Sequence, residues 1–250
     1  MNEKIRFFEE LSANGHAALQ ILQYDGWILR FSEGYTGRAN SVSVLYPSTK
    51  GIEEKVAYCE KCYSQQGLPC IFKLTDNDTE LDGYLAGRGY AVVTPTDVKV
   101  LDLDGTDFGY DESCIFSGDF SQWLPYYFEF EQIGDTAKQD IYRRMLEKVL
   151  VKTIYCTVMY EGKPAACASA AIEHGYMLLQ NVVVDPKLRG KGLGRKLCCA
   201  LIAKAKEAGA RFSYLQVVQT NAAAVGLYEK LGFEKVYTYW YMKKNRECLL

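Results

Sequence analysis

A strand, a loop with three alternating glycines and a helix follow one another directly in the second half of this chain. Residues 181–184 read Asn-Val-Val-Val, which is typical of a strand. The loop carries Gly190, Gly192 and Gly194, and the leucine periodicity after it predicts a helix from about residue 192 to 208. Glycine lets a backbone turn sharply and approach a ligand, and the first amides of a helix have no internal partner. The segment therefore predicts an α/β fold with an anion site, best suited to a phosphate or pyrophosphate.

Basic side chains surround this loop. Arg189, Lys191 and Arg195 add charge-assisted donors, and residues 187–211 hold eight basic residues against one acid. Charge alone also fits a solvated helix face. The whole chain of 250 residues nearly balances 29 Lys and Arg against 31 Asp and Glu, which excludes a strongly cationic protein that coats nucleic acid.

The glycine spacing separates this loop from two common phosphate-binding motifs. It reads G-x-G-x-G, neither the G-x-G-x-x-G of dinucleotide-binding folds nor the G-x-x-x-x-G-K-[ST] of nucleotide triphosphatases. It closely resembles the pyrophosphate-binding segment of the GNAT acetyltransferase superfamily, in which [Q/R]-x-x-G-x-[G/A] follows a strand and opens a helix. Arg189, Gly192 and Gly194 match that pattern. A second block, residues 221–234, resembles the family's N-x-x-A-x-x-L-Y-x-K-x-G-F pattern.

The resemblance covers about residues 105–243, and it implies a GNAT acyl-CoA N-acyltransferase fold, a mixed α/β sheet. It implies transfer of an acetyl group from acetyl-CoA to an amine, with no metal. The cofactor-binding residues that we expect are Val182, Val183, Val184, Arg189, Gly190, Lys191, Gly192, Leu193, Gly194, Arg195 and Asn221. The backbone of the three valines would pair with the pantetheine arm, while Asn221 is a CoA contact, a helix cap or both. Tyr228 matches the family tyrosine that points at the sulfur, which implies that it protonates the departing thiolate.

The order of elements suggests two related units. After a turn at residues 103–107, residues 123–242 read helix, helix, three strands, helix, strand, helix, strand. The segment between Gly67 and Gly89 repeats the pattern between Gly209 and Gly232, although chance similarity of two helix–strand–helix segments also explains it. We therefore expect a degenerate GNAT-like unit at residues 1–104, without a phosphate loop, and a catalytic unit at residues 105–250.

The general base is not evident in the sequence. Many GNAT proteins carry a carboxylate before the phosphate loop, where this chain has Gln180 and Asn181. Other candidates are Glu173 and His174, in the turn before that strand, and Glu129 and Glu131 near the expected acceptor side. Aromatic side chains beside these glutamates form either a wall of an acceptor pocket or a helix core: Trp123, Tyr126, Tyr127, Phe128 and Phe130.

Three functional hypotheses remain open at this point. The first is an acetyl-CoA-dependent N-acetyltransferase acting on a small or unidentified amine. The second is a non-catalytic acyl-CoA-binding module, which the missing carboxylate at Gln180 favours. In the third, the N-terminal unit is an interaction domain that sets the acceptor or a dimer contact. Neither the acceptor nor the choice between monomer and homodimer can be read from the sequence.

Cysteines and the N-terminus bear on location. The nine cysteines are an odd number and most stand in apolar company, which is typical of reduced thiols in a cytoplasmic protein. Cys59 and Cys62 form a C-x-x-C without a second pair at metal spacing. The N-terminus lacks a signal-peptide pattern, and no apolar run is long enough for a membrane helix. We therefore expect neither membrane nor nucleic-acid partners.

Overall fold

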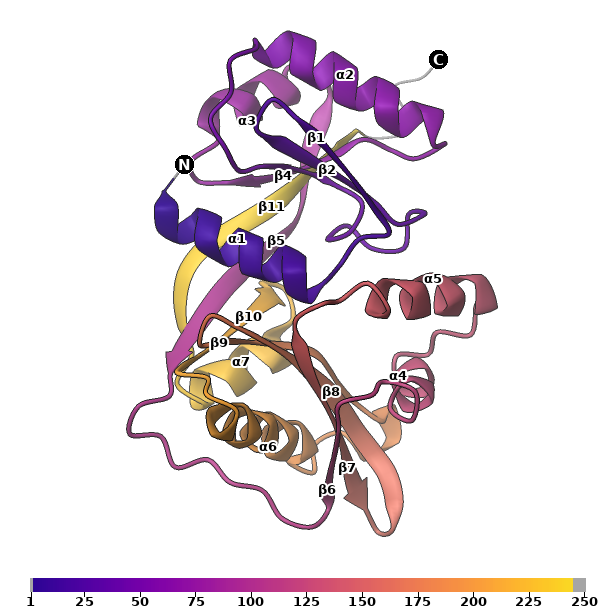
Figure 1. Cartoon of the computed structure of the whole chain (residues 1–250), viewed down its shortest axis with the longest axis vertical. Helices are drawn as coiled ribbons and strands as arrows, with labels where there is room; N and C mark the ends of the chain where they lie inside the picture. The colour runs from indigo at the N-terminus through magenta and orange to yellow at the C-terminus, as the bar shows by residue number, and fades with distance from the viewer. Residues whose placement is uncertain (1, 245–250) are drawn as a thin grey trace. The chain divides into compact units, whose positions relative to one another are not determined.

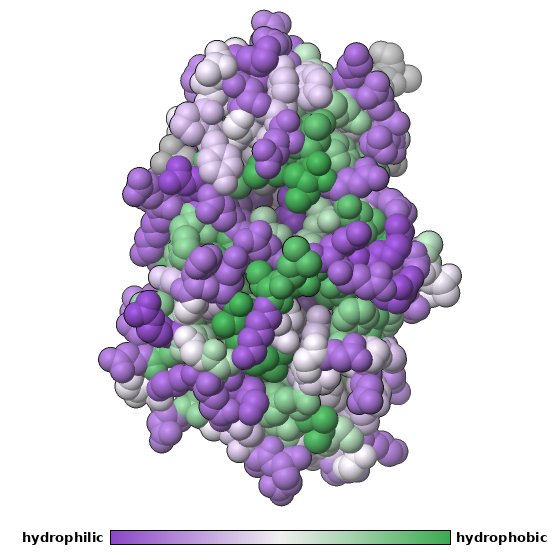
Figure 2. Space-filling model, in the orientation of Figure 1, coloured by the Kyte–Doolittle hydropathy of each residue, from purple (hydrophilic) through white to green (hydrophobic). Residues whose placement is uncertain are grey.

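The computed structural model describes residues 2–244, which form two units (Figure 1). The first unit comprises residues 2–97 together with 237–244, and the second comprises residues 98–236. None of the helices within residues 2–244 has the length and apolar character needed to cross a membrane. The hydropathy surface intersperses hydrophilic and hydrophobic side chains on the face in view (Figure 2).

The first unit is a small mixed sheet with three helices. Its elements are α1 (Glu3–Gly15), β1 (Gln20–Tyr24), β2 (Trp27–Phe31), β3 (Val42–Val44), α2 (Ile52–Gln65), β4 (Ile71–Thr75) and α3 (Thr79–Ala86). β1 and β2 form a hairpin, β3 joins β2 in the antiparallel direction, and β4 runs parallel to β3. Its apolar core gathers Leu29, Val56, Phe72 and Leu85, all fully buried.

The second unit repeats this topology with longer strands. Its elements are β6 (Cys114–Ser117), α4 (Leu124–Phe130), α5 (Thr136–Leu146), β7 (Lys152–Tyr160), β8 (Lys163–Glu173), β9 (Tyr176–Val184), the 3-10 turn η1 (Pro186–Leu188), α6 (Leu193–Glu207), β10 (Phe212–Val218) and α7 (Ala222–Lys230). β7, β8 and β9 are antiparallel neighbours, β6 extends the sheet beyond β7, and β10 runs parallel to β9. This arrangement confirms the predicted mixed α/β sheet.

Both faces of the second unit's sheet are covered. Residues 165–171 of β8 are buried without alternation, whereas a strand with one solvated face alternates buried and exposed side chains. α6 packs against β7, β8 and β9, and α4 packs against β8 and β9 (Figure 1). Leu197, Leu201 and Ala205 of α6 are fully buried in the core, so the apolar stripe that the sequence predicts for this helix holds it to the sheet.

Two strands carry the chain from one unit to the other. β5 (Tyr90–Asp102) begins in the first unit, and Leu101 near its end and Leu103 just after it lie in the core of the second. β11 (Glu234–Lys244) begins in the second unit, and its residues 239–243 pair with β4 of the first. The units defined by packing therefore change at residues 97 and 236. The division expected at residue 104 stays a prediction about domains.

One helix starts earlier than its apolar pattern suggests. The second of the two helices expected after residue 123 has helical character in the sequence over residues 140–150, but α5 spans Thr136–Leu146. The carboxylate of Asp135 accepts hydrogen bonds from the amides of Ala137 and Lys138 and so fixes the start of the helix. The first apolar position of a helix is a poor guide to its first residue when a capping side chain lies upstream.

Candidate functional site

The sheet of the second unit opens between β9 and β10. These parallel strands pair only through residues 176–178 of β9 and 212–214 of β10, and the ladder between them then ends. From there on β9 is paired with β8 alone, with Val183 opposite Cys167 and Val184 opposite Ala166. The other edge of residues 182–184 therefore keeps free backbone groups, which an extended arm can pair with as an added strand.

A bulge sits midway along this opening. The register between β8 and β9 shifts between Cys167 and Ser169, opposite Gln180 and Val183. At the shift Asn181 adopts a left-handed backbone with φ of +58°. Its side-chain amide donates a hydrogen bond to the Ser169 hydroxyl at 2.8 Å. A bulge bends its strand and re-aims side chains. The side chain of Asn181 is thus held by Ser169 of β8. No pattern in the sequence indicates this contact.

The loop after β9 presents uncapped helix amides. Gly190 and Gly192 have φ of +82° and +79°, and Gly192 is the N-cap of α6. Since glycine has no side chain, nothing from the N-cap accepts a hydrogen bond from the first turn. Asp135 and Asn221, by contrast, cap α5 and α7 with their side chains. The amides of the first turn of α6 are left for an external acceptor, and the helix dipole favours an anion there.

The basic side chains of the loop are exposed and differ in what they contact. Arg189, Lys191 and Arg195 all reach solvent. The Lys191 ammonium lies 4.6 Å from the ring centroid of Tyr160 and 3.4 Å from its hydroxyl oxygen. Tyr160 ends β7, and it did not feature among the residues expected from the sequence. No cluster of three or more His, Cys, Asp or Glu suited to a metal occurs within residues 2–244.

Gly194 marks the point where three elements meet. A Cβ added there would lie 3.5 Å from Leu227 Cδ2 of α7 and 3.6 Å from Val184 Cγ2 of β9, which is ordinary contact. Its neighbourhood thus joins the end of β9, the start of α6 and the middle of α7. Tyr228 follows Leu227 in α7, so the second sequence block (residues 221–234) lies beside the glycine loop.

Asn221 and Tyr228 occupy α7 as the spacing predicts. The Asn221 side chain accepts a hydrogen bond from the Ala224 amide at 3.2 Å, so it does cap the helix. Tyr228 is 8% exposed and packs edge-on against Phe233, with 5.9 Å between ring centroids. Burial raises the pKa of its hydroxyl well above the ordinary value, and the nearby Cys198 thiol raises it further. The Tyr228 hydroxyl is therefore protonated across the neutral range.

The candidate bases lie at different places. Glu173 and His174 stand at the turn where β9 begins, which is the paired end of the β9–β10 ladder. At about 3.3 Å per residue, that turn is roughly 20 Å along β9 from the bulge at Asn181. Glu129 lines a groove of about 700 Å³ between α4 and α5. Glu131 instead interacts electrostatically with Arg189 of the loop. Glu131 is the C-cap of α4, and it is exposed to solvent.

The aromatic stripe of α4 belongs mostly to the core. Trp123, Tyr127 and Phe130 are buried, and the Trp123 and Tyr127 rings stack at 4.9 Å. Phe128 instead lines the groove between α4 and α5. Most of the stripe therefore anchors α4 to the sheet.

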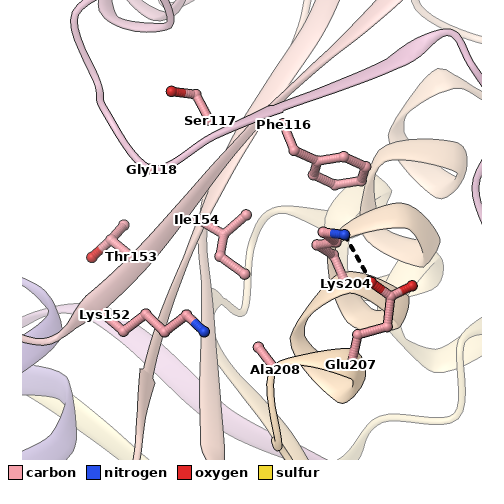
Figure 3. A pocket seen from close by; sticks show the side chains of 9 residues that line it. All are labelled: Phe116, Ser117, Gly118, Lys152, Thr153, Ile154, Lys204, Glu207 and Ala208. Atoms are coloured by element: carbon pink, nitrogen blue, oxygen red, sulfur yellow. Dashed lines mark hydrogen bonds and ion pairs between the residues drawn. The ribbon is translucent and has the colours of Figure 1, made fainter.

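A second pocket lies at the opposite end of α6. Figure 3 shows it between β6, β7 and the last turn of the helix, with Lys204 paired to Glu207. Lys204 is twelve residues from Gly192, roughly 18 Å along the helix at about 1.5 Å per residue. This pocket is thus separate from the glycine loop.

The corresponding loop of the first unit is filled by its own chain. Between β3 and α2, the amides of Thr49 and Lys50 donate to the Asp25 carboxylate at 3.0 and 2.9 Å, and the Thr49 hydroxyl donates at 2.8 Å. The Lys55 ammonium lies 3.3 Å from the same carboxylate, with its side chain 1% exposed. These bonds hold the pKa of Asp25 well below its usual range. Asp25 thus fixes the loop just before α2, whose N-cap Gly51, like Gly192 of α6, gives no side-chain cap to the first turn.

Comparisons with known proteins agree with this geometry. Residues 119–233 match the acetyltransferase (GNAT) family. The chain is 28% identical over 252 residues to YobR, an uncharacterized N-acetyltransferase of Bacillus subtilis, covering 97% of this chain and 100% of that protein. It is 40% identical over 74 residues to the [ribosomal protein bS18]-alanine N-acetyltransferase of Escherichia coli, covering 30% of this chain and 50% of that protein.

Solved structures share the fold at low sequence identity. A GCN5-related N-acetyltransferase from Kribbella flavida superposes with a TM-score of 0.70 at 13% identity, covering 96% of this chain and 95% of that one. A tandem GNAT protein from the clavulanic acid biosynthesis pathway superposes with a TM-score of 0.64 at 15% identity, covering 81% and 74%. The fold predicted from the two sequence blocks is confirmed.

Proposed function

Because this chain belongs, through residues 119–233, to the acetyltransferase (GNAT) family, we propose that it transfers an acetyl group from acetyl-CoA to a primary amine by direct attack in a ternary complex. One observation carries the proposal. The open edge of β9 leads directly to a glycine loop whose helix amides are uncapped. An extended arm can pair with the open edge of β9, and a pyrophosphate at its end can accept hydrogen bonds from the helix amides.

The residues of the loop would hold the donor. The amides of Leu193, Gly194 and Arg195 face the pyrophosphate, and the positive φ of Gly190 and Gly192 shapes the turn that exposes them. The side chains of Arg189, Lys191 and Arg195 supply positive charge. The backbone of Val182, Val183 and Val184 pairs with the pantetheine arm, where an amide also polarises the thioester carbonyl. Asn221 adds a contact beyond its role as a cap.

Tyr228 would act on the leaving group. Its protonated hydroxyl gives a proton to the sulfur as the carbon–sulfur bond breaks. The alternative is a module that binds acyl-CoA without turnover, which the absence of a carboxylate at Gln180 and Asn181 favours.

The first unit would be a degenerate copy of the same fold. Both units order a hairpin, a third strand, a helix and a parallel strand in the same way. Since Asp25 occupies the first unit's loop, we propose that each chain binds one acetyl-CoA.

Release of free CoA thiol in the presence of an amine panel tests the function. The panel includes small alkylamines and a peptide with an N-terminal alanine, the acceptor residue in the name of one relative. We expect thiol release that depends on at least one amine, and weaker acetyl-CoA binding in Arg189→Ala. Binding without turnover across the panel would favour the non-catalytic module.

A further inference from the structure

We propose that Asn181, held in place by Ser169, binds the nitrogen of the acceptor and selects primary amines. The inference rests on the proposed acetyl transfer and deepens it, because it names a residue that sets the acceptor class. An amide side chain accepts and donates hydrogen bonds but takes up no proton at neutral pH. Asn181 therefore positions the nitrogen and is not a general base.

The backbone of Asn181 is unusual for a residue inside a strand. Its φ of +58° lies in the left-handed region, although the residue belongs to β9. Glu161 and His174 also have positive φ, of +51° each, but they stand in the turns that join β7 to β8 and β8 to β9. A tight turn accounts for those two residues and not for Asn181. Backbone conformations of this kind cluster at ligand sites, where the surrounding structure holds them.

The Asn181 side chain lies on the face of the sheet opposite α6. Alternate residues of β8 belong to the core that α6 covers, namely Ala166, Ala168 and Ala170. Successive side chains of a strand point to opposite faces, so Ser169 points to the other face. Asn181 bonds to Ser169 and is half-buried, so its amide is held on that face and remains within reach of a solute.

The place of Asn181 along β9 matches the acetyl end of the proposed donor. The pyrophosphate would lie at the start of α6, and the pantetheine arm would run back along residues 184 to 182. The next residue on this path is Asn181. The ladder between β9 and β10 closes at Leu178, three residues or roughly 10 Å further on. An arm inserted at the open edge would therefore end beside Asn181.

One half of the Asn181 amide is engaged and the other half is available. Its Nδ2 donates to the Ser169 hydroxyl at 2.8 Å, and Ser169 is 1% exposed. A buried group of β8 thus fixes the orientation of the amide. Across the part of the chain that the structure describes, this is the only side-chain hydrogen bond of Asn181. Its Oδ1 is left to accept a hydrogen bond from an N–H of the incoming amine.

Such a hydrogen bond favours primary amines. A neutral primary amine has two N–H groups, and it can donate one to Oδ1 while its lone pair faces the acetyl carbon. That N–H remains in the product amide, so the hydrogen bond persists through the transfer. A secondary amine has a single N–H, which it loses in the reaction. A site built to hydrogen-bond an N–H discriminates against an analogue that lacks it.

Bonds and protons balance in this transfer. The nitrogen lone pair forms a bond to the acetyl carbon as the carbon–sulfur bond breaks. The nitrogen loses one proton to solvent and keeps the one that it donates to Asn181. The Tyr228 hydroxyl gives its proton to the sulfur and regains one from solvent.

Asn181→Gly tests the assignment, with Glu161→Gly as its matched control. Glycine adopts positive φ without strain, so both variants keep the local backbone and lose only a side chain. For a primary alkylamine at saturating acetyl-CoA, we expect kcat/KM of Asn181→Gly to fall roughly tenfold, the loss of one hydrogen bond. The calorimetric Kd for acetyl-CoA stays unchanged, and Glu161→Gly keeps the wild-type kcat/KM.

The N-methyl derivative of the same alkylamine separates a specific contact from a structural role. It has no N–H to keep, so its kcat/KM should be the same in Asn181→Gly as in the wild type, and the preference for the primary amine should shrink. Ser169→Ala leaves the backbone of β9 untouched and releases the Asn181 amide. We expect it to lower kcat/KM for the primary amine, by less than Asn181→Gly does, with the same acetyl-CoA Kd.

The outcomes separate this inference from the proposed function. An unchanged kcat/KM for the primary amine in Asn181→Gly, or equal losses for the primary and N-methyl amines, would overturn the role of Asn181. A weaker acetyl-CoA Kd in Ser169→Ala would make the pair a support of the strand instead. If the wild-type protein releases no thiol with any amine, the proposed function itself fails.

Discussion

Gly192 and Gly194 are two residues apart, and the structure predicts opposite consequences when each is replaced by alanine. Gly192 has φ of +79°, and a Cβ there would meet nothing within 4 Å, so the whole penalty is conformational. An L-residue in the left-handed region costs about 1–2 kcal/mol. Gly194 lies inside α6, and its added Cβ would make only ordinary contact with Leu227 and Val184. Alanine in a helix is up to about 1 kcal/mol more favourable than glycine.

The conformational cost of Gly192→Ala lowers either the stability of the fold or the affinity for acetyl-CoA. If the backbone keeps its shape, Gly192→Ala lowers the free energy of unfolding by about 1–2 kcal/mol. If it relaxes, the first amides of α6 turn away from the pyrophosphate. One lost hydrogen bond to a charged group is worth about 1.5–3 kcal/mol, or about 10- to 100-fold in Kd. Gly194→Ala leaves the Kd near wild type and the stability equal or higher.

Calorimetric titration with acetyl-CoA and urea unfolding of both variants measure these quantities. Gly190→Ala, with φ of +82°, should behave like Gly192→Ala. If Gly194→Ala weakens binding as much as Gly192→Ala does, the left-handed backbone is not what shapes the loop.

Three further changes test other parts of the account. Tyr228→Phe keeps the ring against the core and removes the proton donor, so kcat should fall about 100-fold with an unchanged Kd; unchanged turnover from pH 7 to 9 would exclude the acid role. Asp25→Asn should lower the urea midpoint at pH 7. Since the folded-state pKa of Asp25 is depressed, its stabilisation is present above the unfolded pKa and disappears as pH falls through the folded one, so the two proteins should converge in acid; a constant gap contradicts this. Lys73→Met strands the buried Glu9 carboxylate and should cost about 3–5 kcal/mol; recovery in the Glu9→Gln double variant, read by urea unfolding, would confirm the pairing.

The sequence predicted the fold where local pattern and packing agree. α6 spans Leu193–Glu207 with Gly192 and Ala208 as caps, close to the range that leucine periodicity and Gly209 indicate. The residues Gly190, Gly192 and Tyr228 stand in the elements predicted for them. Their roles as ligands or catalysts stay predictions, since those depend on bound molecules.

Long-range features of the site were not predictable. The capping role of Asn221 can be predicted from local spacing. The contact of Asn181 with Ser169, by contrast, depends on a bulge that is set by the register of two strands. The filling of the first unit's loop by Asp25 joins residues 24 positions apart. Glu129 lines the groove between α4 and α5, whereas Glu131 is the C-cap of α4, and the groove exists only once the two helices pack. These features depend on tertiary packing, which a single sequence pattern does not encode.

The central claim is that the glycine loop of the second unit holds one acetyl-CoA whose acetyl group passes to an amine. Mass spectrometry of an alkylamine incubated with the protein and acetyl-CoA labelled in its acetyl group tests it most directly. We predict a labelled N-acetyl amine and one equivalent of free CoA thiol per product, with both reduced in parallel in Arg189→Ala and Gly192→Ala at limiting acetyl-CoA. Labelled product that forms equally well in both variants would contradict the claim.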